Sequence, residues 1–145
     1  MSNIKACLSS NTDDWKTPSE LFNYFMKKGY RDLFEYKMNK NQFDILYRNE
    51  KLYINPPFSK LKLIPDYIEQ LISLNNEIIL LIPSRTDTIY FHKLLKFKPK
   101  IYFIKGRLHF NDSKLSAPFP TILMEFKNYL MTSYDVYKGV KWCID

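Results

Sequence analysis

The spacing of apolar residues predicts an amphipathic helix near the start of the chain. These residues recur at the three- and four-residue intervals of an α-helix: Leu21, Phe22, Phe25 and Met26. Thr17-Pro18-Ser19-Glu20 precedes them and is typical of a helix start, with Thr17 as the N-cap and proline at the first helical position. Gly29 supplies the stop. Residues 1–12 are polar and without period, so we expect a flexible arm there and a single domain over residues 13–145.

Further along, short apolar runs alternate with helical periodicity. Residues 78–82 form an uninterrupted apolar run ended by Pro83, which is typical of a strand buried on both faces of a parallel sheet. The pattern predicts helices at about 64–74 and 87–95, and strands at 51–54, 100–104, 108–110 and 121–126. Residues 30–50 predict no definite element. The alternation predicts a compact α/β fold whose sheet is mainly parallel, with an antiparallel element at its C-terminal edge.

Composition favours a globular domain and argues against several other classes. Hydrophobic residues make up 46% and charged residues 26% of the chain, which is unlike a disordered protein. No apolar run approaches the roughly 18 residues of a membrane span, and we expect no signal peptide. Two cysteines, Cys7 and Cys143, and two histidines, His92 and His109, show no metal-ligand spacing. We therefore expect reduced intracellular thiols and no metal site.

The charge balance favours a polyanionic partner. The 22 Lys and Arg residues exceed the 15 Asp and Glu residues and give a net charge of +7. Cations that neutralise phosphates release counterions, so an excess of this sign favours nucleic acid. Aromatic residues account for 17% of the chain, and although most belong in a core, rings beside cations also suit base stacking. Composition alone leaves nucleic-acid binding open.

The segment Asn55-Pro56-Pro57-Phe58 carries the candidate chemistry. It follows a predicted strand, where sites of α/β proteins lie. The Asn55 side-chain oxygen and the Pro56 carbonyl are two acceptors for an amino group, and the two prolines restrict the backbone that holds them. Phe58 offers a ring on which an extruded base can stack. The alternative is a plain strand-ending turn, but this four-residue pattern arises by chance in only about one chain in a hundred.

Four further segments, in order, share a pattern with a known family. They are Asp14-Trp15-Lys16-Thr17-Pro18, Arg85-Thr86-Asp87-Thr88 with Tyr90-Phe91-His92, Lys105-Gly106-Arg107-Leu108-His109-Phe110, and Ala117-Pro118-Phe119-Pro120. Together with the Asn-Pro-Pro-Phe segment, they resemble the phage-type DNA N6-adenine methyltransferases (Dam-like) over residues 13–126. The resemblance implies a truncated Rossmann-like methyltransferase sheet. It further implies transfer of a methyl group from S-adenosylmethionine to adenine N6 in DNA, without a metal.

The resemblance also assigns roles to individual residues. Asn55, Pro56, Pro57 and Phe58 become catalytic. Trp15, Thr17 and Pro18 bind the cofactor, whose carboxylate suits a helix N-terminus. Asp44, followed by Ile45, accepts a hydrogen bond from the cofactor adenine. Glu35 stands where the family has an aspartate, and this departure, with only three glycines in the chain, leaves a catalytically silent DNA-binding relative as an alternative.

The remaining motif residues have either a functional or a purely structural interpretation. Arg85, Lys105 and Arg107 are candidate phosphate contacts or else solvated surface charge. Tyr90, Phe91 and Phe119 are expected in the core, and Ser84 and Asp87 as caps of the next helix. Cytosine N4, RNA or a protein glutamine remain alternative substrates. The resemblance implies a viral or prophage gene whose product acts in the host cytoplasm on DNA.

Overall fold

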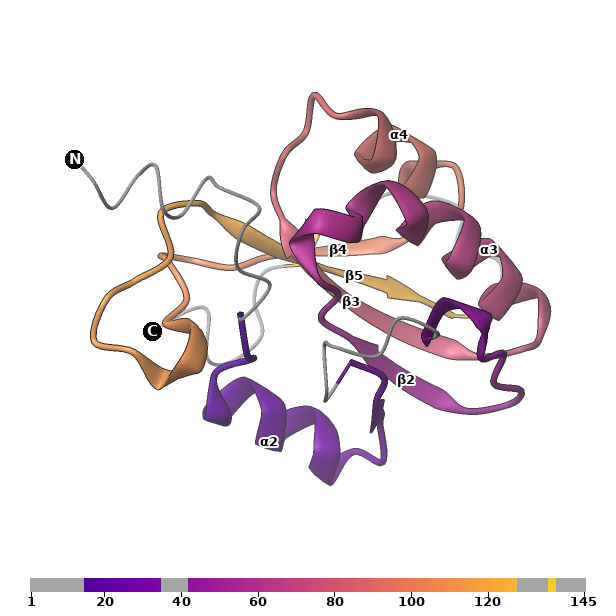
Figure 1. Cartoon of the computed structure of the whole chain (residues 1–145), viewed down its shortest axis with the longest axis horizontal. Helices are drawn as coiled ribbons and strands as arrows, with labels where there is room; N and C mark the ends of the chain where they lie inside the picture. The colour runs from indigo at the N-terminus through magenta and orange to yellow at the C-terminus, as the bar shows by residue number, and fades with distance from the viewer. Residues whose placement is uncertain (1–14, 35–41, 128–135, 138–145) are drawn as a thin grey trace.

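A sheet with helices on both faces organises the structure, a computed structural model that describes residues 15–34, 42–127 and 136–137. Figure 1 shows α3 (Ile64–Ser73) and α4 (Ile89–Leu95) on one face and α2 (Ser19–Lys27) on the other. The arm expected at residues 1–12 lies outside the described residues. No helix in the described ranges has the length and apolarity needed to cross a bilayer.

The six strands of the sheet run in the order β1-β2-β3-β5-β4-β6. Their bounds are β1 (Arg31–Asp32), β2 (Lys51–Ile54), β3 (Glu77–Pro83), β4 (Lys100–Phe103), β5 (Thr121–Phe126) and β6 (Val136–Tyr137). Neighbours pair in parallel except at β5, which is antiparallel to both β3 and β4. The expected mixed α/β sheet, mainly parallel, is therefore confirmed.

The position of the antiparallel strand differs from the prediction. We expected it at the C-terminal edge, but β5 lies inside the sheet, between β3 and β4. All six residues of β5 are buried. A strand without a solvated face leaves water-excluded backbone groups unless both its sides are paired, so an interior position suits β5 better than an edge.

Side-chain alternation along the strands divides the core into two clusters. In β2, Leu52 and Ile54 face α3 and α4, whereas Tyr53 faces α2. In β3 the same alternation sends Leu80 to the first cluster and Leu81 to the second. Because both faces are covered, the uninterrupted apolar run of β3 is fully buried, as the sequence predicted.

Two helices agree closely with the sequence prediction, and one predicted strand is wrong. Helix α3 ends one residue earlier than expected, and α4 begins at Ile89 because residues 84–88 form a turn in which the Thr88 hydroxyl donates to the Arg85 carbonyl. Residues 108–110 form no strand. Instead Phe110–Asp112 is a 3-10 helix, and the Asn111 amide bonds to the Lys16 carbonyl. Strands β1 and β6 were not predicted.

The start of α2 corrects the expected helix cap. Pro18 occupies the N-cap position, and Thr17 makes no cap bond. The carboxylate of Asp112, far away in sequence, accepts hydrogen bonds from the Ser19 amide at 2.9 Å and from the Ser19 hydroxyl. A tertiary contact therefore satisfies the helix terminus. At the other end, Gly29 has a φ of +87° and ends the helix as predicted.

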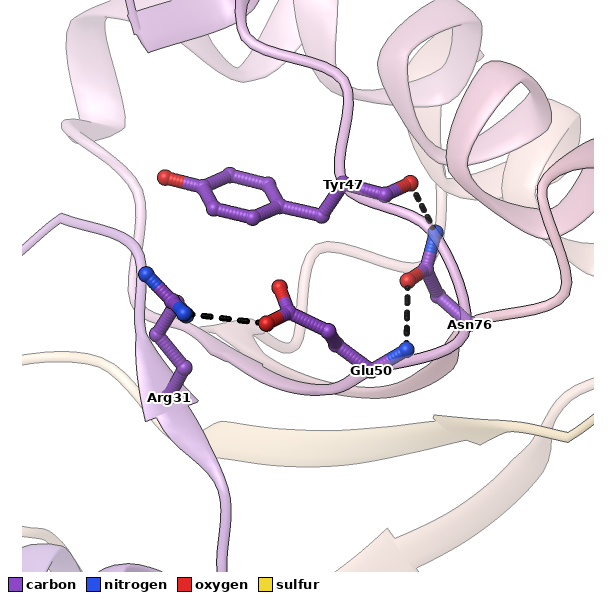
Figure 2. Close-up of polar contacts among 4 residues, drawn as sticks. All are labelled: Arg31, Tyr47, Glu50 and Asn76. Carbon is purple, nitrogen blue, oxygen red and sulfur yellow. Dashed lines mark hydrogen bonds and ion pairs between the residues drawn. The ribbon is translucent and has the colours of Figure 1, made fainter.

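A buried asparagine ties the amino ends of the central strands together. Asn76, which directly precedes β3, donates from its amide to the Tyr47 carbonyl at 2.7 Å and accepts from the Glu50 backbone amide at 3.0 Å (Figure 2). The Glu50 carboxylate pairs with Arg31 of β1 at 2.9 Å. These contacts hold β1, β2 and β3 in register at their amino ends, which also fixes where their carboxyl ends lie.

Candidate functional site

The carboxyl ends of four strands meet at one edge of the sheet. Strands β1, β2, β3 and β4 share a direction, so the segments that follow them emerge together. Asp32 ends β1, Asn55 follows β2, and Arg85 and Lys105 follow β3 and β4. The Ser84 amide, which donates to the Pro120 carbonyl at 2.9 Å, joins two of these segments. In α/β sheets this edge is where ligands bind.

Asn55 is buried at this edge and is held by its amide nitrogen. Its side chain is 2% exposed. Nδ2 donates to the Trp15 carbonyl at 2.6 Å and to the Thr17 hydroxyl oxygen at 3.1 Å. A carbonyl can only accept, so the Trp15 contact identifies which end of the amide is nitrogen. The segment Trp15-Lys16-Thr17-Pro18 and the Asn-Pro-Pro-Phe segment, far apart in sequence, therefore meet.

The other end of the same amide is a buried acceptor without a partner. Within the described part of the chain, no group bonds to Asn55 Oδ1, although that atom is inaccessible to solvent. Buried polar atoms are nearly always hydrogen-bonded, because an unmade bond costs about 1–3 kcal/mol. An unpaired acceptor at the ligand-binding edge therefore matches a ligand that donates a proton from nitrogen or oxygen.

The two prolines hold the backbone around this acceptor. Pro56 and Pro57 are both buried, and Pro57 has a φ of −59° and a ψ of 126°. The 3-10 helix Phe58–Leu63 begins immediately afterwards. Because proline fixes its own φ and restricts the residue before it, the loop keeps this shape without a ligand.

A buried phenol is linked to the Asn55 amide through the Thr17 hydroxyl. Tyr53, in β2, is fully buried, and its hydroxyl lies 2.9 Å from the Thr17 hydroxyl. Burial raises the pKa of the Tyr53 phenol far above its ordinary value, and the charge of Asp32 adds to the increase. Tyr53 therefore stays protonated. If Thr17 donated, the phenolic proton would need another acceptor inside the surrounding apolar cluster, so the phenol is the better donor.

Phe58, which follows the two prolines, forms a cluster with three other aromatic rings. Phe58 is half-buried and lies nearly parallel to Trp15, with ring centroids 6.2 Å apart and planes at 22°. Phe110 and Phe119 meet Phe58 edge-on, at centroid distances of 6.0 and 5.5 Å. Phe119 is buried, as the sequence predicted, and so are Tyr90 and Phe91 on the opposite face of the sheet. No sequence pattern indicated that Phe110 and Phe119 support Phe58.

The loop between β4 and β5 is fastened beside these rings. Asn111 bonds with the Lys16 backbone and Asp112 accepts from Ser19, so the middle of the loop is held against the start of α2. Arg107 lies on this loop and donates to the Ala117 carbonyl at 3.4 Å. The side chains of Arg85, Lys105 and Arg107 are all exposed, as a contact with an external polyanion requires.

The residues expected to bind a cofactor are only partly brought together. Trp15 and Thr17 contact Asn55, and Pro18 starts α2 next to them. Asp44 is exposed at the end of the 3-10 helix Gln42–Asp44, which is packed down through Phe43. Glu35 lies outside the described residues.

Asp32 is an acidic residue that sequence reasoning missed. It ends β1 and pairs in register with Tyr53, and its carboxylate accepts from the Phe34 amide at 3.3 Å. Since β1 contains only two residues within a polar segment, no apolar pattern marked its end. The nearest predicted strand begins only at Lys51, so no sequence signal pointed to Asp32. No cluster of three or more metal-ligating side chains occurs among the residues that the structure describes.

Comparison with known proteins adds one finding to this geometry. A family model described as DNA N-6-adenine-methyltransferase (Dam) matches residues 5–122, most of the chain. No curated protein and no solved structure matches the chain. The family match spans every segment of the site described above, from Trp15 to Phe119.

Proposed function

Because the chain belongs to the DNA N-6-adenine-methyltransferase (Dam) family, we propose that it transfers a methyl group from S-adenosylmethionine to the N6 amino group of adenine in DNA. The observation that carries this proposal is the buried, unpaired Oδ1 of Asn55. The exocyclic amino group of adenine is a donor that can pair with this acceptor. We therefore place the reacting nitrogen beside Asn55.

The acceptor has a direct chemical use. The lone pair of the adenine amino nitrogen is delocalised into the ring, which makes the nitrogen a poor nucleophile. Hydrogen bonds from its two protons to Asn55 Oδ1 and the Pro56 carbonyl draw the nitrogen towards a tetrahedral geometry. Both acceptors are fixed in place beforehand, so they stabilise the charge that develops during transfer without reorganising.

The aromatic rings provide a place for the base. An adenine in a duplex must leave the stack before its amino group can enter a buried site. Phe58 remains half-exposed, and its ring is supported by Trp15, Phe110 and Phe119. We place the extruded adenine against Phe58, where stacking contributes about 1–3 kcal/mol.

The polar groups around the site suit S-adenosylmethionine, which would supply an electrophilic methyl group on a sulfonium. When Tyr53 donates to Thr17, the Thr17 hydroxyl keeps its own proton for an anionic group such as the cofactor carboxylate. The Ser19 amide is already bonded to Asp112, so Thr17 is the better donor at this helix start. Asp44 is the proposed acceptor for the cofactor adenine. Asp32, rather than Glu35, is our candidate for the acidic residue after the first strand.

The exposed cations at the same edge are the proposed DNA contacts. Arg85 follows β3, and Lys105 and Arg107 follow β4, so all three emerge at the edge that holds Asn55, on the β3 side of β2. Phosphate contacts of this kind orient the duplex without reading its sequence. We further propose that the sheet is a truncated version of the Rossmann-like methyltransferase sheet.

Methyl transfer is tested by incubating the protein with S-adenosylmethionine and adenine-containing DNA and analysing the nucleosides by mass spectrometry. We expect N6-methyladenine. N4-methylcytosine would keep the loop chemistry and replace the substrate. DNA that is bound but never methylated, together with no binding of S-adenosylmethionine, would establish the silent DNA-binding alternative. RNA of the same sequence, assayed in parallel, separates the two nucleic acids.

A further inference from the structure

We propose that Tyr53 is a positioning residue for methyl transfer: through Thr17, its phenol holds the Asn55 amide with Oδ1 facing the substrate. This inference rests on the proposed function and extends it to a residue that never touches the substrate. It concerns a side chain that would otherwise be part of the hydrophobic core.

Tyr53 lies near the end of β2, close to the catalytic loop. Tyr53 and Asn55 are two residues apart at the end of β2, so their side chains project from the same face of the sheet. The Tyr53 ring packs nearly parallel to Phe25 of α2, with centroids 5.2 Å apart. This packing fixes the ring and therefore the place of its hydroxyl.

Burying a hydroxyl at this position costs free energy unless the hydroxyl is hydrogen-bonded. Tyr53 is fully buried among apolar neighbours, where phenylalanine would fill the same space without a polar atom. Its hydroxyl is 2.9 Å from Thr17 Oγ1, and Thr17 Oγ1 is 3.1 Å from Asn55 Nδ2. The hydroxyl therefore extends the hydrogen-bond network of the catalytic loop by one residue.

The hydrogen bonds from Tyr53 through Thr17 to Asn55 fix the orientation of the Asn55 amide. Thr17 Oγ1 accepts one hydrogen bond from the Tyr53 phenol and uses its other lone pair to accept from Asn55 Nδ2. Thr17 and the Trp15 carbonyl therefore both bind the nitrogen end of the amide. With both Nδ2 protons engaged, the amide cannot rotate to present nitrogen to the substrate. Without the phenol, Thr17 is free to turn its own proton towards Nδ2, which weakens their hydrogen bond.

Tyr53→Phe tests this inference, because it removes only the hydroxyl. We expect the single-turnover rate of methyl transfer, at saturating DNA and S-adenosylmethionine, to fall roughly 3- to 10-fold. Dissociation constants for both ligands and the melting temperature should change little. Tyr102→Phe is the matched control: it deletes a phenol that donates to Glu125 at 3.1 Å on the same face of the sheet, away from the site. Its rate should equal that of the wild type.

A double-mutant cycle separates positioning from packing. Thr17→Val breaks the connection, so adding Tyr53→Phe to it should lower the rate by less than about twofold further. Thr17→Ser keeps the hydroxyl, and in that background Tyr53→Phe should have its full effect. Additive losses in the Thr17→Val background would mean that Tyr53 acts by packing and would overturn the inference.

Two results distinguish a failure of this inference from a failure of the proposed function. A wild-type rate for Tyr53→Phe, in a protein that methylates adenine and loses activity in Asn55→Ala, refutes the role of Tyr53 alone. A wild-type protein that binds S-adenosylmethionine and DNA but transfers no methyl group refutes both proposals.

Discussion

The Asn55 side chain donates from Nδ2 to the backbone carbonyl of Trp15 at 2.6 Å, across 40 residues of sequence. This bond determines the orientation of the amide, since a carbonyl accepts and never donates. It leaves Oδ1 as a buried acceptor at the edge of the sheet where ligands bind.

Asn55→Ala should lower the rate of methyl transfer at least about 100-fold, because it removes an acceptor that acts on the reacting nitrogen. Binding of S-adenosylmethionine should stay within a few-fold of wild type, since the side chain acts mainly on the nucleophile. Single-turnover kinetics and calorimetric titration measure the two effects. Asn23→Ala, at an exposed position of α2, is the control. Substantial methylation by Asn55→Ala would remove the mechanism.

Phe58→Ala should impair stability, DNA binding and rate together. The ring contacts Trp15, Phe110 and Phe119, so its removal should cost about 3 kcal/mol of unfolding free energy. Phe58→Tyr and Phe58→Trp should keep much of the activity, because stacking requires a ring. Chemical denaturation and transfer rates test this series. If Phe58→Ala lost stability but the folded fraction methylated normally, the ring would be a core residue only.

Asp44→Ala should weaken binding of S-adenosylmethionine by on the order of 1.5–3 kcal/mol, the usual cost of a lost hydrogen bond to a charged group. Titration calorimetry measures the change. Glu69→Ala, an exposed position in α3, removes a carboxylate elsewhere and should bind normally. Undiminished binding by a folded Asp44→Ala protein would place the residue outside the cofactor site.

Affinity for DNA should fall steeply as salt rises. Arg107→Ala should reduce the slope of log K against log salt by about 0.9 if its exposed guanidinium neutralises one phosphate. Lys96→Ala, at the end of α4 and before the amino end of β4, removes the same charge at the opposite edge and should leave the slope unchanged. Equal slopes for all three proteins would exclude Arg107 from the DNA surface.

Acid should loosen the contact between the β4–β5 loop and α2. Hydrogen bonds from the Ser19 side chain and backbone lower the pKa of Asp112 below its usual value. A lowered pKa in the folded state means that the contact stabilises the protein above the ordinary Asp pKa of about 3.9, and that this stabilisation is lost as pH falls further. Melting temperatures from pH 7 to pH 3 should therefore fall less for Asp112→Asn than for wild type. Identical pH profiles would contradict the assignment.

The sequence by itself determined the elements whose information is local. The apolar run ended by Pro83 predicted β3, and helical spacing after residue 64 predicted α3, because both patterns describe side chains that share one surface. The Asn-Pro-Pro-Phe segment was predicted at the end of a strand, because proline restricts its own backbone and that of the residue before it. That effect is also local. The family resemblance named Trp15 and Thr17 as cofactor-binding residues, and their roles there stay a prediction.

Only the tertiary structure decided what depends on partners distant in sequence. The two-residue strand β1 has no apolar pattern and exists because it pairs with β2, which is why Asp32 escaped notice. The sequence around Thr17 is typical of a helix N-cap, yet Asp112 makes the hydrogen bonds at the start of α2. The Thr17 hydroxyl instead bonds to both Asn55 and Tyr53. Strand β5 lies within the sheet because burying it between two neighbours satisfies its backbone. A hydrogen bond depends on proximity in space. The spacing of residues along the chain shows which residues are close within one helix or strand, but it does not show which elements pack together.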